Sequence, residues 1–63
     1  MDLADIIIAH INEEIKPLEE AVTSGRPDSL DEYKRLCGEI RGMLIARDIV
    51  ATIKHEMETF DDE

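Results

Sequence analysis

A single break in an otherwise helical pattern most constrains what this chain can fold into. The break lies at Ser24-Gly25-Arg26-Pro27-Asp28-Ser29. Gly25 suits a left-handed helix end and Pro27 prevents a helix from continuing. Ser29 and Glu32 have the spacing of a capping box at the start of a second helix. The expected elements are a helix at about 3–24, a turn at 25–28, a helix at about 29–60 and an acidic tail at 61–63.

The first stretch carries apolar residues at helical spacing. Asp2 is a good N-cap residue. The apolar residues that share one helix face are Leu3, Ile7, Ile11, Ile15, Leu18 and Val22. Ile6 and Ile8 flank this face, so the start of the helix is expected to be buried on more than one side. Pro17 removes a backbone donor, and a kink is expected near residues 13–17.

The second stretch carries a longer apolar pattern with the same spacing. Its members are Tyr33, Leu36, Ile40, Met43, Ala46, Val50, Ile53, Met57 and Phe60. A second stripe recurs every seven residues, at Cys37, Leu44 and Ala51. Two stripes on one helix predict two neighbours, and no run of residues alternates as a strand would. The predicted fold class is all-α, a two-helix antiparallel hairpin with a longer second helix.

The unequal lengths of the two helices predict a second chain. At 1.5 Å per residue the first helix is about 33 Å long and the second about 45–48 Å. Folded back, residues 3–24 cover only about 29–50, which leaves an apolar overhang from Ile53 to Phe60. We therefore expect a homodimer in a four-helix arrangement. The residues expected at the partner interface are Ile6, Ile8, Val50, Ile53, Met57 and Phe60.

Three small residues lie four apart within the predicted second helix, at Gly38, Gly42 and Ala46. Glycine within a helix costs roughly 1 kcal/mol relative to alanine, so something is expected to compensate. The preferred explanation is a close helix crossing, either within the hairpin or at the dimer centre. A groove for an external ligand is the alternative. The motif indicates close packing more strongly than it indicates a function.

The charge of the chain excludes several partners. The net charge is −9, with −5 on residues 1–24, zero on residues 25–50 and −4 on residues 51–63. Such a chain is repelled by nucleic acid and by anionic membranes. The longest apolar runs are far shorter than the ~20 residues that span a bilayer. The start of the sequence is acidic, unlike a signal peptide, and a cytoplasmic location is expected.

No residue constellation for catalysis or for a metal is visible, and no cofactor is expected. Cys37, the only cysteine, excludes an internal disulfide and is interpreted as a structural thiol rather than a nucleophile. His10 and Glu14 are one helical turn apart, but two ligands are too few for a metal site. His55 is interpreted as a solvated side chain. An enzyme is therefore disfavoured.

The acidic residues allow two interpretations. Glu13, Glu14, Glu19 and Glu20 form an acidic patch on the first helix. Basic residues that could pair with this patch are Lys34, Arg35, Arg41 and Arg47, although such surface pairs are weak. The tail at 61–63 either solubilises the end of the chain or docks into a basic pocket of a larger partner, and the first is preferred.

The run from Tyr33 through Gly38, Gly42 and Ala46 to Val50, followed by the acidic end, resembles small uncharacterised helical proteins of tailed bacteriophages. The resemblance covers the second helix, about half of the chain. It implies a phage protein encoded among virion or accessory genes, located in the virion or in the host cytoplasm. It brings no known catalytic residues.

Two functions follow as hypotheses. The first is a non-enzymatic protein–protein interaction module that dimerises and binds a larger protein, as a bacteriophage virion or assembly component. The alternative is an acidic inhibitor that occupies a basic, nucleic-acid-binding surface of a host protein. Salt distinguishes them, because binding through charge weakens steeply as ionic strength rises.

Overall fold

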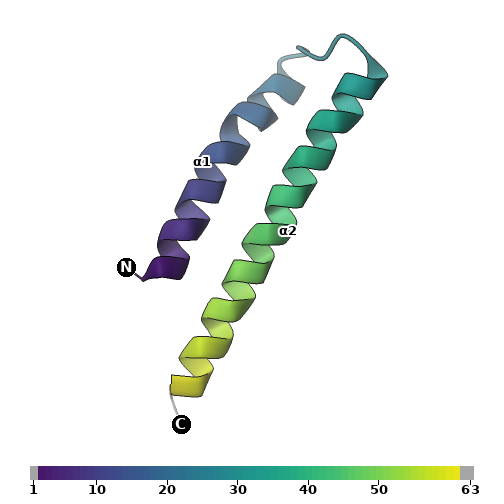
Figure 1. Cartoon of the computed structure of the whole chain (residues 1–63). Helices are drawn as coiled ribbons and strands as arrows, with labels where there is room; N and C mark the ends of the chain where they lie inside the picture. The colour runs from purple at the N-terminus through teal and green to yellow at the C-terminus, as the bar shows by residue number, and fades with distance from the viewer. Residues whose placement is uncertain (1, 62–63) are drawn as a thin grey trace.

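The computed structural model describes residues 2–61, with the side chains of residues 2–60, and shows two antiparallel α-helices (Figure 1). Helix α1 spans Leu3–Thr23 and helix α2 spans Leu30–Asp61. The hairpin is 53 Å long, 18 Å wide and 12 Å thick. These observations confirm the all-α hairpin with a longer second helix. Asp61 ends α2, and the rest of the tail predicted at 61–63 lies outside the described residues.

Capping residues mark both ends of helix α1: Asp2 is its N-cap and Ser24 its C-cap. The backbone N–H of Asp5 donates to Asp2 Oδ1 at 2.9 Å, and the N–H of Asp2 donates to Asp5 Oδ2 at 3.5 Å, which together form a capping box. At the other end the N–H of Ser24 donates to the Glu20 carbonyl at 2.9 Å. Gly25 follows with φ of +76°, a conformation that glycine adopts without steric cost.

Helix α2 begins with only half of the capping box that the sequence predicted. The Glu32 N–H donates to Ser29 Oγ at 3.1 Å. The Glu32 carboxylate does not complete the box, because the Arg35 guanidinium donates to both of its oxygens, at 3.1 and 2.6 Å. These bonds from Arg35 hold the pKa of the Glu32 carboxyl below its usual value. The position of the helix start was nevertheless predicted to within one residue.

The core between the two helices is small. Ile15 of α1 and Leu36 of α2 are the buried apolar residues, with 4% and 7% of their surfaces exposed. Leu18 and Val22 of α1 and Ile40 of α2 are half-buried on the same faces. Because a single small core contributes only a few kcal/mol, this hairpin has little stability to spare.

Two polar contacts between the helices fix their register. Arg47 Nη1 donates to Asn12 Oδ1 at 2.7 Å, and Lys54 Nζ donates to an Asp5 carboxylate oxygen. The second contact places the start of α1 beside Lys54. Helix α1 therefore reaches about one turn further along α2 than the limit of residue 50 that the lengths alone predicted.

Among the described residues, the acidic patch of α1 does not pair with the basic residues of α2 that were considered as its partners. Arg35 bonds Glu32 and Glu39 on its own helix, and Arg47 bonds Asn12 instead of a glutamate. Glu13 pairs with Lys16, one turn away on α1, at 3.3 Å. Local partners are favoured because residues three or four apart are neighbours on one helix surface.

The single apolar stripe predicted along α2 does not face α1 throughout. Leu36 is buried and Val50 is half-buried against α1, whereas Ala46 and Phe60 are exposed. The nine apolar residues from 33 to 60 are on average closer together than the 3.6 residues of one helical turn. Each successive residue therefore falls slightly short of a full turn, and over the whole stripe this shift adds up to roughly half a turn around the helix. The end of the stripe consequently lies on a different face from its start.

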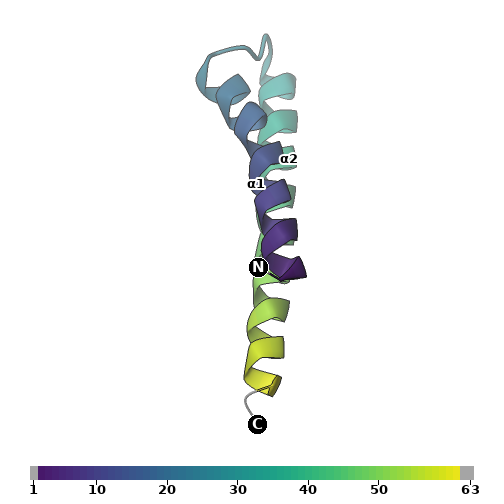
Figure 2. The same ribbon diagram turned by 90° about the vertical axis from the view of Figure 1, so that its left-hand side faces the viewer.

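The C-terminal part of α2 extends beyond the start of α1, as Figures 1 and 2 show from two directions. Ile53 and Met57 line a groove with Leu3 and Ile7 of α1, so the part of α2 without a neighbour in the same chain is shorter than the predicted 53–60. The exposed fractions are nevertheless 49% at Ile53, 62% at Met57 and 80% at Phe60. Pro17 lies inside α1, which continues through it to Thr23, and the kink expected at residues 13–17 stays a prediction.

Candidate interaction surface

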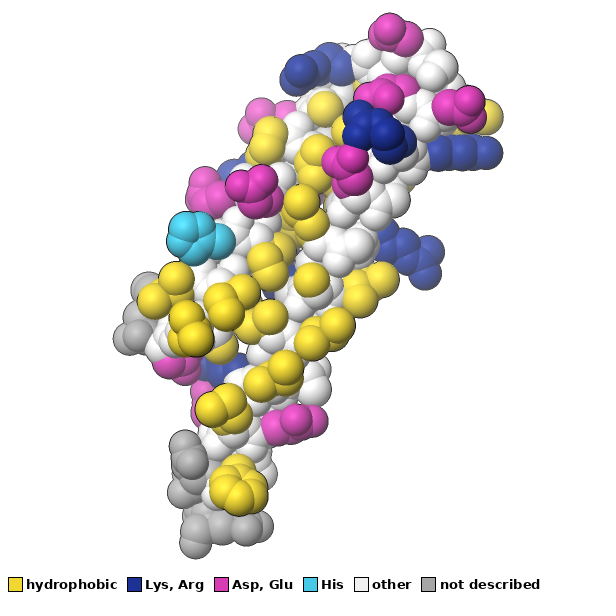
Figure 3. Space-filling model, viewed as in Figure 1, with side chains coloured by type: hydrophobic (Ala, Val, Ile, Leu, Met, Phe, Trp, Pro, Cys, Tyr) yellow, Lys and Arg dark blue, Asp and Glu magenta, His cyan; other side chains and the backbone are white. Residues whose placement is uncertain are grey.

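The hairpin carries a continuous exposed apolar surface, here called the apolar face. Figure 3 shows apolar side chains in a band over both helices and along the C-terminal half of α2. The residues that form the apolar face are Leu3, Ile6 and Ile7 of α1 and Ile45, Ile49, Ile53, Met57 and Phe60 of α2. All of them have more than a third of their surface exposed. Exposed apolar surfaces of this kind are candidates for interaction sites.

Three shallow grooves on the hairpin share apolar-face residues. A groove of about 290 Å³ includes Ile6 and Ile7, and a groove of about 440 Å³ includes Leu3, Ile7 and Ile53. A third groove, of about 320 Å³, is lined by Ile45, Ile49 and Ile53 together with polar residues. Since Ile7 lines the first two and Ile53 the last two, the grooves form one connected surface.

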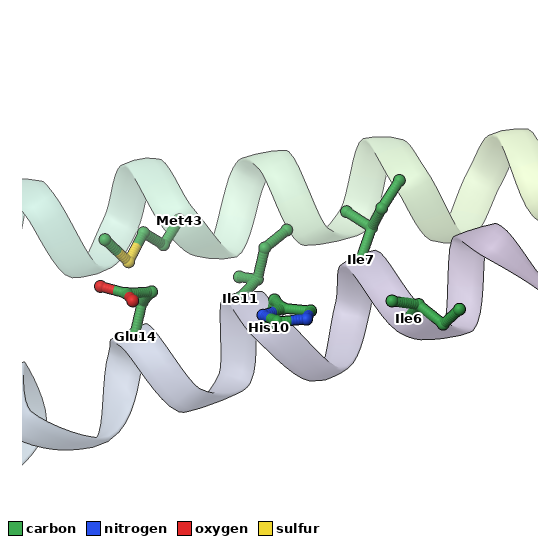
Figure 4. A pocket seen from close by; sticks show the side chains of 6 residues that line it. All are labelled: Ile6, Ile7, His10, Ile11, Glu14 and Met43. Atoms are coloured by element: carbon green, nitrogen blue, oxygen red, sulfur yellow. The ribbon is translucent and has the colours of Figure 1, made fainter.

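The smallest of these grooves contains the only ionisable pair considered from sequence as a metal site. Figure 4 shows His10 among isoleucines, with Glu14 one turn along α1 and next to Met43 of α2. Within the described residues there is no cluster of three histidine, cysteine, aspartate or glutamate side chains that could hold a metal ion. The groove therefore offers apolar contact with a polar edge.

Gly38, Gly42 and Ala46 do not contact α1. All three are exposed, and a Cβ atom built at either glycine would have no neighbouring atom within 4 Å. The predicted close crossing within the hairpin is therefore wrong. The physical reason is that Leu36, Ile40 and the residues in helical register with them occupy the side of α2 that faces α1. The alternative crossing, at a dimer centre, stays a prediction.

The residues predicted at the partner interface divide into two groups. Ile6, Ile53, Met57 and Phe60 are exposed members of the apolar face. Ile8 and Val50 are half-buried because they lie in register with the buried core residues of their helices. Part of their apolar surface is used inside the hairpin, and their place at a partner interface stays a prediction.

The predicted interface lacked four members of the apolar face. Leu3 and Ile7 were placed on the main apolar stripe of the first helix, and Ile45 and Ile49 were assigned to neither stripe of the second. Their signal was present, because Ile45, Ile49 and Ile53 recur every four residues. Only the structure shows that this row faces away from α1, with exposed fractions of 52% and 54% for the first two.

Charged residues border the apolar face. Asp48 and Glu56 line one groove with Ile45 and Ile49. Lys54 lies at another edge, where its bond to Asp5 raises the lysine pKa and lowers the aspartate pKa. The arrangement of an apolar centre with a charged border is typical of protein interfaces.

Two further ionisable groups of α2 have shifted pKa values. Interaction with the neighbouring Cys37 thiol raises the pKa of Tyr33. The bonds from Arg35 to Glu32 and Glu39 raise the pKa of the arginine.

Comparison with known protein families, with characterised proteins and with solved structures finds no match. In the described part of the chain, neither helix has the length and apolar character needed to cross a membrane.

Proposed function

We propose that this chain is a non-enzymatic protein–protein interaction module that binds through the apolar face. The supporting observation is the imbalance between core and surface. Two side chains are buried inside the hairpin, whereas eight large apolar residues of the apolar face are exposed. Burial of apolar surface is favourable by roughly 25 cal/mol per Å², so a partner that covers this face gains free energy that the hairpin alone leaves unused.

The partners in this proposal are a second copy of the chain and a larger protein. Charged residues at the border of the apolar face, such as Asp48 and Glu56, contribute to the orientation of a bound partner. A bacteriophage virion or assembly complex, in the virion or the host cytoplasm, is the setting suggested by the resemblance of α2.

A second candidate function rests on the acidic surface of α1. Glu13, Glu14, Glu19 and Glu20 are all exposed, and they could occupy a basic surface that otherwise binds nucleic acid. Binding of this kind depends on charge and falls steeply between low and high salt. Binding through the apolar face changes little with salt, because apolar burial is not screened.

Matched charge insertions test the leading proposal. Ile49→Glu places a carboxylate in the apolar face, and His55→Glu adds the same group at an exposed position of α2 outside it. Sedimentation measures self-association of both variants, and affinity capture from the native source measures binding to other proteins. We expect Ile49→Glu to abolish association and His55→Glu to preserve it.

Two results would contradict the proposal. The first is a wild-type chain that neither self-associates nor captures a protein in a salt-resistant manner. The second is equal binding by the Ile49→Glu variant and the wild type. Capture that disappears in high salt and survives Ile49→Glu would instead support the acidic inhibitor. A virion component is further distinguished by its presence in purified particles at a copy number set by their symmetry.

A further inference from the structure

We propose that a second copy of this chain covers the apolar face in an antiparallel dimer, with the two-fold axis beside Ile49. The inference rests on the proposed interaction function and adds the identity, direction and register of one partner. In this dimer the α2 helices pack against each other in opposite directions, and the bulky C-terminal residues of each copy cover the glycines of the other.

The register follows from the positions of small and bulky residues around Ile49. Phe60 and Gly38 lie eleven positions from Ile49 on opposite sides, and Ile53 and Ile45 lie four positions from it. Met57 and Gly42 lie eight and seven positions from it. An antiparallel pair centred on Ile49 therefore places a large side chain opposite a small one at both ends, and isoleucine opposite isoleucine near the axis.

In the single chain, the bulky residues are exposed and the surface over the glycines is open, as the proposed dimer requires. Phe60 and Met57 are the two most exposed large residues of the C-terminal half of α2, at 80% and 62%. No atom lies within 4 Å of a Cβ built on Gly38 or Gly42. Interhelical packing places side chains of one helix into gaps on the other, and the glycines supply the gaps for these two residues.

The charges at the border of the apolar face also favour the antiparallel direction. Arg41 and Glu56 lie eight and seven positions from Ile49 on opposite sides. Both are exposed; Arg41 lies one helical turn before Ile45, and Glu56 lines a groove with Ile45 and Ile49. In the antiparallel dimer Arg41 of each copy approaches the partner's Glu56, which forms two attractive pairs. A parallel dimer would instead bring arginine beside arginine and glutamate beside glutamate, which is repulsive.

The start of α1 lies at the level of the proposed axis. Ile7 lines a groove together with Val50 and Ile53 of α2. Each copy contributes two helices, so the assembly has four helices, with the two α2 helices at its centre.

A distance measurement tests the direction of the dimer. A spin label at Lys34→Cys, in a chain that also carries Cys37→Ser, lies fifteen positions from Ile49 on an exposed part of α2. The antiparallel dimer separates the two labels by about 45 Å along the helix axis. A parallel dimer places them at the same height, within about 25 Å of each other, from the spacing of packed helices. Pulsed dipolar spectroscopy separates these values.

A size exchange tests the register. Gly38→Leu is expected to weaken dimerisation at least tenfold without reducing helicity, because the position is open within one chain but filled by the partner's Phe60. Adding Phe60→Ala to Gly38→Leu is expected to restore most of the association. Sedimentation equilibrium gives the dissociation constants, and circular dichroism confirms that each variant is folded.

Each unfavourable result has a definite meaning. A label distance within about 25 Å overturns the antiparallel direction, and dimerisation unchanged by Gly38→Leu overturns the register. A monomeric wild type at millimolar concentration overturns the dimer. The proposed interaction function survives all three results if the chain captures another protein and Ile49→Glu abolishes that capture. That outcome would identify a different protein as the occupant of the apolar face.

Discussion

The same substitution, glycine to alanine, is expected to change stability in opposite directions at two positions of this chain. Gly42 lies in the middle of α2 with negative φ, and a Cβ atom there meets nothing within 4 Å. Gly25 follows the end of α1 with φ of +76°, also without a neighbour within 4 Å. Steric clashes are therefore absent at both positions, and only backbone conformation distinguishes them.

The magnitudes follow from the backbone at each position. Gly42→Ala gains helix propensity and is expected to raise the free energy of unfolding of the single chain by about 0.8–1 kcal/mol. Gly25→Ala forces an L-residue into the left-handed region and is expected to lower it by about 1–2 kcal/mol. For a 63-residue chain the total is only about 3–9 kcal/mol, so the two variants are expected to differ clearly.

Urea unfolding followed by circular dichroism measures both effects. It is carried out over a range of protein concentrations and extrapolated to infinite dilution, where the dimer does not contribute. A loss of stability for Gly42→Ala at infinite dilution would refute the reasoning, since it would mean that α1 approaches this face after all. A gain at high dilution that shrinks as concentration rises would match the partner contact proposed for Gly42.

Three further predictions follow from the fold. Leu36→Ala is expected to destabilise the single chain by about 2–5 kcal/mol, whereas Ile53→Ala, at an exposed position, is expected to affect association more than unfolding at high dilution. Ser29→Ala removes the oxygen that caps α2 and is expected to cost about 1 kcal/mol in thermal or urea unfolding. The Asp5–Lys54 pair lowers the pKa of the aspartate and raises that of the lysine, so its contribution is present between about pH 4 and pH 10. It is lost as the pH falls through the folded-state pKa of Asp5 or rises through that of Lys54, and double-mutant cycles across a pH series are expected to show the largest coupling near pH 7, with a decline toward both extremes.

Local sequence signals predicted the elements of this fold accurately. Asp2, Gly25 and Ser29 marked the helix ends to within one residue, because capping depends on groups only a few residues apart. The longer α2 and its exposed apolar end also followed from residue spacing and from 1.5 Å per residue. The Asp2–Asp5 capping box was missed because the expected signature has glutamate or glutamine at the third helical position.

The orientation of α2 toward α1 was less accessible from the sequence. By their spacing, the apolar residues from Tyr33 to Phe60 formed one stripe. Most of them are three rather than four residues apart, so the stripe rotates around α2 and its end no longer faces α1. Two rows of apolar residues compete for the α1 side of the helix, and spacing alone ranks neither above the other. For this reason Ile45 and Ile49 were missed.

The sequence by itself determined where each helix begins and ends, that the second is longer, and that the chain has more apolar surface than its own hairpin can bury. These properties depend on short-range capping and on length. Only the tertiary structure decided which row of α2 faces α1, through the burial of Leu36 against α1 and the bonds of Arg47 to Asn12 and Lys54 to Asp5. Register and rotation are set by contacts between residues far apart in the chain, and in this hairpin those contacts left the glycines on the open side.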